Sequence, residues 1–189
     1  MAAISALLDS CILYPARLRD LLLSLAAADL FRPIWSQMIH EEWMTSVLTN
    51  RSDLTRLQLE AARSAMDRAF PAASISGFES LMPAFSLPDP DDRYVLAAAV
   101  HARADLIVTI NLKDFPARVL ASHGIVAVHP DPFIDYLFDQ DESEAIAAVA
   151  RMRSRLRAPS MSPSDFIDSI AQVGMPLTAS RLRSHANRI

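Results

Sequence analysis

Acidic side chains gather in residues 87–115, which read LPDPDDRYVLAAAVHARADLIVTINLKDF. A helix is expected to begin at the acidic opening of this stretch, and a buried strand is expected over the β-branched run 106–110. The polar residues that flank these two elements are Asp89, Asp91, Asp92, Asn111 and Asp114. A helix, a buried strand and polar groups at the strand's carboxyl end are the layout of a ligand site in an α/β protein.

Two further segments can bring acids to the same place. Asp9 directly follows an apolar run, residues 3–8, that predicts a first strand. Asp9 and Asp114 would then each follow a strand, and in a parallel sheet both would reach the same edge. A helix expected over residues 37–48 carries Glu41 and Glu42, either of which is a candidate.

A cluster of carboxylates predicts a bound cation. Carboxylates close together repel one another unless a positive charge offsets them. Hard oxygen ligands, with no Cys or His expected nearby, favour Mg²⁺ or Mn²⁺ over zinc. Such an ion lowers the pKa of a coordinated water and stabilises charge that builds on a phosphoryl oxygen. Hydrolysis of a phosphodiester is therefore the predicted chemistry.

Each acid also has a purely structural interpretation. Asp89 could cap the helix that follows it, with Asp92 in the first turn, where acids favour the helix dipole. Asp114 could cap a short helix, and the pair Glu41 and Glu42 could lie on a solvated face. Asp9 is the exception, because an acid just beyond an apolar strand is costly unless it has a partner or reaches a site. For the others, spacing alone leaves both interpretations open.

The elements that must position these residues indicate an α/β protein. Further strands are expected near residues 31–35 and 125–128, and segments of helical spacing separate the strands. In the helix expected over 53–69, Leu57 and Met66 are predicted to face inward. This alternation of strands and helices predicts a three-layer α/β/α sandwich around a parallel sheet.

The C-terminal part of the chain is predicted to be helical. An acidic, polar run near residues 139–143 is followed by helical spacing and by helix starts near Ser162 and Thr178, with no strand pattern. We therefore expect a sheet domain over residues 1–140 and a helical extension over residues 141–189.

Composition excludes several classes of protein. The chain has 189 residues with only three glycines and one cysteine, Cys11. Phosphate loops rich in glycine, an internal disulfide and a cysteine-based zinc site are thereby excluded. A single cysteine is typical of a reducing compartment, and no apolar run is long enough to cross a bilayer. A cytoplasmic protein without membrane contact is expected.

Charge is divided unevenly along the chain. Residues 1–144 hold 11 Lys and Arg against 20 Asp and Glu, whereas residues 145–189 hold 7 Arg against two Asp. Arginines alternate from Arg151 to Arg157, which would spread them over more than one helix face. They are usually a solvated surface. The sharper hypothesis is that arginines such as Arg151 and Arg155 contact RNA phosphates or an acidic partner segment.

These motifs resemble a known family. The segment LLDSCIL containing Asp9, the helix SQMIHEEWMTSVL, the stretch DPDDRYVLAAAVHARADLIVTINLKDF and a final IVAVHP strand are similar to a PIN domain of the VapC toxin type. The resemblance covers about residues 1–140. Its most specific part is the pattern D-x-x-x-L-x-x-A…A-D-L-I-V-T-x-N-x-x-D-F of residues 92–115.

The resemblance implies roles for individual residues. Family members are metal-dependent ribonucleases, so Asp9, Asp92 and Asp114 would coordinate Mg²⁺ or Mn²⁺. Glu42, six positions after Ser36, matches the family's helical glutamate better than Glu41 does. The positions that match pocket-lining or supporting residues are Thr109, Asn111 and Asp89.

The leading hypothesis is an endoribonuclease that forms the toxin half of a toxin–antitoxin pair. The resemblance implies an RNA substrate, an antitoxin that occludes the pocket, and a homodimer. One alternative is a non-catalytic binding protein that uses the same fold. A receiver-type phosphotransfer module is the other, but it would need an acid pair after the first strand, where Asp9 stands alone.

Overall fold

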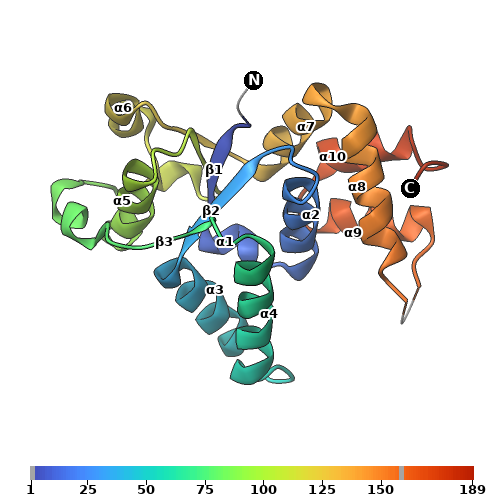
Figure 1. Cartoon of the computed structure of the whole chain (residues 1–189), viewed down its shortest axis with the longest axis horizontal. Helices are drawn as coiled ribbons and strands as arrows, with labels where there is room; N and C mark the ends of the chain where they lie inside the picture. The colour runs from blue at the N-terminus through green and yellow to red at the C-terminus, as the bar shows by residue number, and fades with distance from the viewer. Residues whose placement is uncertain (1–2, 158–159) are drawn as a thin grey trace. The chain divides into compact units, whose positions relative to one another are not determined.

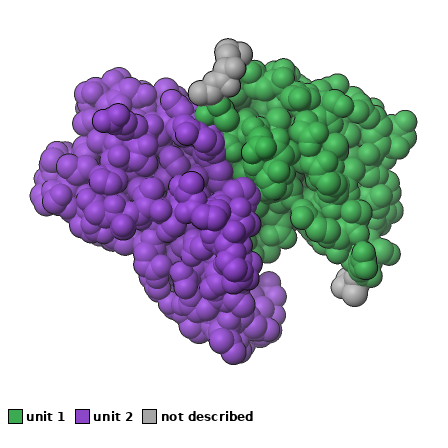
Figure 2. Space-filling view, viewed as in Figure 1, with its two compact units in different colours: residues 1–3, 15–31, 129–189 green, residues 4–14, 32–128 purple. Residues whose placement is uncertain are grey.

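The computed structural model describes residues 3–157 and 160–189 (Figure 1). The chain forms two compact units, shown in different colours in Figure 2. One unit, here called the sheet unit, comprises residues 4–14 and 32–128. The other, the helical unit, combines residues 15–31 with residues 129–189. The domain boundary predicted near residue 140 stays a prediction.

Five parallel strands form the sheet, in the order β3-β2-β1-β4-β5. Their bounds are β1 (Ser5–Leu8), β2 (Arg32–Ser36), β3 (Ser74–Ile75), β4 (Leu106–Val108) and β5 (Val126–Val128). Strand β1 is central, since Leu7 pairs with Ile34 on one side and Ile107 on the other. The four residues of β1 are all buried, as expected of a parallel strand covered on both faces. The predicted α/β fold with a parallel sheet is confirmed.

Strand β4 ends earlier than the sequence predicts. Its β-branched run continues to Ile110, but that side chain is 46% exposed. The hydroxyl of Thr109 accepts a hydrogen bond from the backbone N–H of Asn111 at 2.9 Å. This local side-chain bond turns the chain away from the sheet directly after the strand.

Helices of the sheet unit surround these strands. They are α1 (Ser10–Leu13), α3 (Gln37–Asn50), α4 (Arg56–Ala69), α5 (Arg93–His101) and α6 (Ala117–Leu120), with 3-10 turns at η1 (Glu79–Ala84), η2 (Pro90–Asp92), η3 (Leu112–Asp114) and η4 (Ala121–His123). Helix α5 contacts β1, β2 and β4, and its residues 95–99 are fully buried. Ala97–Ala99 allow this close approach because their side chains are small.

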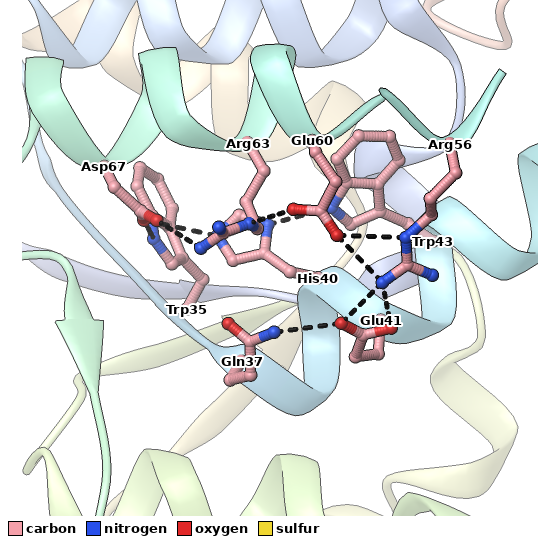
Figure 3. A network of polar contacts seen from close by, with 9 residues as sticks. All are labelled: Trp35, Gln37, His40, Glu41, Trp43, Arg56, Glu60, Arg63 and Asp67. Carbon is pink, nitrogen blue, oxygen red and sulfur yellow. Dashed lines mark hydrogen bonds and ion pairs between the residues drawn. The ribbon is translucent and has the colours of Figure 1, made fainter. Parts of the chain in front are cut away.

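Helices α3 and α4 meet through polar side chains (Figure 3). His40 is 1% exposed, and its Nδ1 accepts a hydrogen bond from the indole N–H of Trp43 at 3.0 Å. On the α4 side, Asp67 accepts from the indole of Trp35 at 2.9 Å and pairs with Arg63 at 3.1 Å. The imidazole Nε2 of His40 lies 3.4 Å from Asp67 Oδ1.

The inward face of α4 therefore agrees only in part with the one that the apolar pattern predicts. Leu57, expected inside, is 80% exposed, whereas Leu59 and Met66 are buried. The prediction for Leu57 was wrong because Glu60, Arg63 and Asp67 turn toward α3, and this polar pairing is invisible to a hydrophobic pattern.

The helical unit consists of α2 (Ala16–Ala26), α7 (Pro130–Gln140), α8 (Glu142–Ser154), α9 (Pro163–Gln172) and α10 (Pro176–Arg183). Helix α9 begins as predicted, with the Ser162 hydroxyl accepting from the N–H of Asp165. Helix α10 begins at Pro176, two residues before Thr178. Among the described residues, none of the helices has the length and apolar character needed to traverse a lipid bilayer.

Asp131 caps α10 from a distant position in the sequence. The N-cap residue Met175 offers no side-chain acceptor. The carboxylate of Asp131, 3% exposed, instead accepts from Leu177 N–H at 2.8 Å, Thr178 N–H at 2.9 Å and the Thr178 hydroxyl at 2.7 Å. It thereby ties α10 to α7.

We predict that Asp131→Ala destabilises the protein by about 2–3 kcal/mol, because buried donors of Thr178 lose their acceptor. Urea unfolding monitored by circular dichroism would measure this. The exposed Asp165, in the first turn of α9, supplies the control, since Asp165→Ala should cost about 1 kcal/mol or less. Equal losses in the two variants would contradict the assigned role.

The buried His40 should make the free energy of unfolding depend on pH. Burial lowers the pKa of His40 below its ordinary 6.5, and Nδ1 must stay unprotonated to accept from Trp43. Below pH 6.5 the unfolded chain takes up a proton that the folded chain refuses, so the free energy of unfolding falls with pH. His40→Gln should flatten this decline between pH 6.5 and 5 by up to about 1.4 kcal/mol per pH unit. The exposed His101→Gln should leave it unchanged, and an unaltered slope in His40→Gln would refute the prediction.

Candidate functional site

Asp9 lies where the two central strands end. Its backbone N–H donates to the carbonyl of Val108 at 3.1 Å, which joins the end of β1 to the end of β4. The side chain is 4% exposed, and its carboxylate accepts from the Ser10 N–H and from the Thr109 hydroxyl, both at 2.7 Å. The sequence expectation that Asp9 needs a partner is met by these donors.

Thr109 and Asn111 shape the loop beyond β4. Thr109 is fully buried, and its hydroxyl donates to Asp9 while it accepts from the Asn111 N–H. Asn111 then opens the turn η3, at whose end Asp114 is 8% exposed. Lys113 Nζ lies 4.0 Å from Asp114, but the Lys113 side chain is 82% exposed, so solvent screens the pair.

Asp92 experiences the charge of the other acids. The pKa of the Asp92 carboxyl is raised to about 7, first by burial and then by the negative charges of Asp9, Asp89, Asp114 and Glu42, in that order. One of its oxygens, Oδ2, is buried without a hydrogen-bond partner. The predicted acids of three separate segments therefore act on one carboxylate.

Glu41 and Glu42 point to different partners. The hydroxyl of Tyr94, at the start of α5, donates a hydrogen bond to Glu42. Glu41 instead accepts two hydrogen bonds from Arg56, at 2.7 and 2.8 Å, and one from Gln37 (Figure 3). Because neighbouring helix positions are rotated by about 100°, only one of the two glutamates can face α5.

An open groove of about 470 Å³ borders Glu42 and Tyr94 along α3. Its lining comes from α3, from the turn η2 and from α5, and consists of Gln37, Met38, Glu41, Glu42, Thr45, Ser46, Asp91 and Tyr94. The carboxylates in this set give the groove a negative character.

Asp89 fits both interpretations of the sequence. It is exposed and caps the turn η2 by accepting from the Asp91 N–H at 2.9 Å. It also raises the pKa of Asp92 through its charge. The cap and the contribution to the acidic cluster are compatible, because a carboxylate has more than one acceptor oxygen.

The structure adds Cys11 to the site, contrary to the expectation that no Cys lies near the acids. Its Sγ is 3.1 Å from Asp9 Oδ2 and 3.4 Å from the Thr109 hydroxyl. Burial, followed by the charge of Asp9, raises the pKa of the Cys11 thiol to about 12. The thiol thus stays protonated and donates to Asp9. A short helix starting at Ser10 would have revealed this neighbour, but α1 has only four residues and leaves no periodic signal.

The tail arginines make contacts within the helical unit. Arg151 pairs with Glu144 at 2.6 Å, and Arg155 donates to the Ser24 hydroxyl at 2.9 Å. Their predicted contact with RNA or a partner stays a prediction.

The oxygen-rich cluster fits a hard divalent cation in its chemistry. In the part of the chain that the structure describes, no group of three or more His, Cys, Asp or Glu side chains is arranged to hold a metal ion. The buried, unpartnered Oδ2 of Asp92 and the uncompensated carboxylates nevertheless offer the donors and the negative potential that Mg²⁺ or Mn²⁺ requires. The single sulfur is a protonated thiol, which disfavours a soft metal.

Comparisons with known proteins agree with this architecture. Residues 5–113 match the PIN domain model, and residues 130–184 match the VapC50 C-terminal domain. A curated relative from Mycobacterium tuberculosis (strain ATCC 25618 / H37Rv), "Putative ribonuclease VapC50", is 40% identical over 81 residues. The aligned part covers 43% of this chain and 48% of that protein, so the chain spans about half the length of this relative. No solved structure matches the chain. Because the PIN domain model covers more than half of its residues, the chain belongs to the PIN domain family, and its C-terminal part is similar to the VapC50 C-terminal domain.

Proposed function

We propose that this protein is an endoribonuclease that depends on Mg²⁺ or Mn²⁺ and hydrolyses RNA phosphodiester bonds. The observation that carries the proposal is the acidic cluster around Asp92, whose raised pKa and unpartnered oxygen indicate a site built for a cation. The curated relative is named as a ribonuclease, which supports the same chemistry.

The acids would have different roles, which depend on where each one lies in the site. Asp9, Asp92 and Asp114 would hold the cation, which supplies a more acidic coordinated water and stabilises charge on the phosphate. Thr109 orients Asp9 through its hydroxyl, and Asn111 closes the loop that carries Asp114. Glu42 lies on the open side, beside the groove, where its carboxylate could accept a proton from an incoming nucleophile.

We further propose that the protein is the toxin half of a toxin–antitoxin pair and forms a homodimer. The match to the VapC50 C-terminal domain and the relative's name support the VapC type. An antitoxin would suppress cleavage by covering the acidic site.

The raised pKa of Asp92 predicts an unusual dependence of stability on pH. Between about pH 3.8 and 7 the folded protein keeps a proton on Asp92 that the unfolded chain has released. The contribution of this carboxyl to stability is therefore present below pH 3.8 and is lost as the pH rises through 7. In EDTA at pH 7.5, Asp92→Asn should melt about 2–4 °C above the wild type, the shift that about 1 kcal/mol produces in a chain of this size.

Addition of Mn²⁺ at pH 7.5 should raise the melting temperature of the wild type and not that of Asp92→Asn. The exposed neighbour Asp91 gives a matched control, because Asp91→Asn should respond to Mn²⁺ as the wild type does. Identical melting curves for wild type and Asp92→Asn in all conditions would show that Asp92 is an ordinary surface acid.

Cleavage of a mixed pool of structured RNAs tests the activity itself. The wild type should cleave with Mg²⁺ or Mn²⁺ and not with EDTA, and Asp92→Asn or Glu42→Gln should lose at least about 100-fold in rate. Glu41→Gln should stay near the wild-type rate, because Arg56 already pairs with this carboxylate. Equal cleavage by all variants would mean that the activity belongs elsewhere. An inactive wild type that still binds Mn²⁺ would favour the non-catalytic alternative.

A further inference from the structure

We propose that Tyr94 is a positioning residue, which holds the carboxylate of Glu42 at the acidic cluster by a hydrogen bond from its hydroxyl. This inference rests on the proposed function and deepens it, because it assigns a role to a residue outside the predicted set of acids.

Tyr94 is well placed to hold another side chain still. It is 6% exposed in the first turn of α5, a helix whose residues 95–99 are fully buried. Its ring is therefore fixed by packing, and its hydroxyl is protonated at neutral pH and can donate. The acceptor is Glu42, which lies 52 positions earlier in the sequence.

Glu42 needs such support. It is exposed on α3 and borders the open groove, so its side chain has room to leave the cluster. In residues 3–157 and 160–189, Tyr94 is the partner to which the structure bonds it. Without the phenol, the carboxylate would gain rotamer freedom and solvent, and the site would lose one of the charges that act on Asp92.

The same hydroxyl connects the three segments that carry acids. Tyr94 also shares a hydrogen bond with the side chain of Ser10, the residue next to Asp9. It stands two positions after Asp92 in the sequence. The phenol thus lies at the junction of α1, α3 and α5, where a group that orients acids from several elements is most effective.

A double-mutant cycle of Tyr94→Phe and Glu42→Gln tests the proposal. Phenylalanine keeps the buried ring and removes only the hydroxyl. Calorimetric titration with Mn²⁺ and the rate of RNA cleavage are measured for the wild type, both single variants and the double variant. We expect each single variant to lose about 10-fold or more in Mn²⁺ affinity and in cleavage. The double variant should lose no more than Glu42→Gln alone, because Tyr94 acts through Glu42.

Tyr136→Phe is the matched control, since it removes the hydroxyl of a tyrosine that is 43% exposed on α7; it should behave as the wild type. Additive losses in the double variant overturn the proposal, because a packing role of Tyr94 would act regardless of Glu42. Unchanged Mn²⁺ affinity and cleavage rate in Tyr94→Phe overturn it as well. A wild type that binds no Mn²⁺ also overturns it. A wild type that binds Mn²⁺ with the expected cycle but cleaves no RNA overturns only the proposed function.

A measurement on the intact tyrosine covers the case in which Tyr94→Phe does not fold. The chain has three tyrosines, so the hydroxyl proton of Tyr94 can be assigned by NMR with Tyr14→Phe and Tyr136→Phe. We expect a slowly exchanging hydroxyl signal that shifts in Glu42→Gln. A signal that exchanges freely, or that ignores the Glu42 substitution, contradicts the hydrogen bond.

Discussion

Carboxylates that are brought together away from water must be neutralised, and this constraint governs the sheet unit. Parallel strands deliver the residues after β1 and β4 to the same edge, so Asp9 and the loop with Asp114 are neighbours by topology. Asp92 then joins them from the start of α5. In the absence of a cation the cluster can only retain a proton, which is why the pKa of Asp92 rises to about 7. Under the proposed function, a divalent ion would displace this proton.

Neutral donors surround the cluster and fix its geometry. The Thr109 hydroxyl and the Cys11 thiol both donate to Asp9, while the Tyr94 hydroxyl donates to Glu42. None of these groups carries a positive charge, so they orient the carboxylates and leave their charge uncompensated. The arrangement keeps the negative potential available to a ligand, whereas an arginine in the same position would cancel it.

The polar contact between α3 and α4 differs from the acidic cluster, because its acids are paired with arginines. Between α3 and α4, each acid faces an arginine, and Glu41 and Glu60 both pair with Arg56. The neutral His40 lies within this contact and accepts from Trp43. Adjacent glutamates of α3 thus have different partners, since Glu41 pairs with Arg56 and Glu42 accepts from Tyr94. The two side chains point in different directions because neighbouring positions of a helix are rotated by about 100°.

The sequence by itself determined the parallel α/β fold, four of the five strands and the acids that follow β1 and β4, because apolar periodicity and strand-end position are local properties. It could not determine which face α4 buries, since the contacts of Arg56 with Glu41 and of Asp67 with His40 have no apolar signature (Figure 3). Tertiary structure alone brought Thr109 to Cys11 and Tyr94 to Glu42, and let Asp131 cap α10 across 46 positions. These contacts join residues far apart in the chain, and their energies depend on burial, which no local pattern encodes.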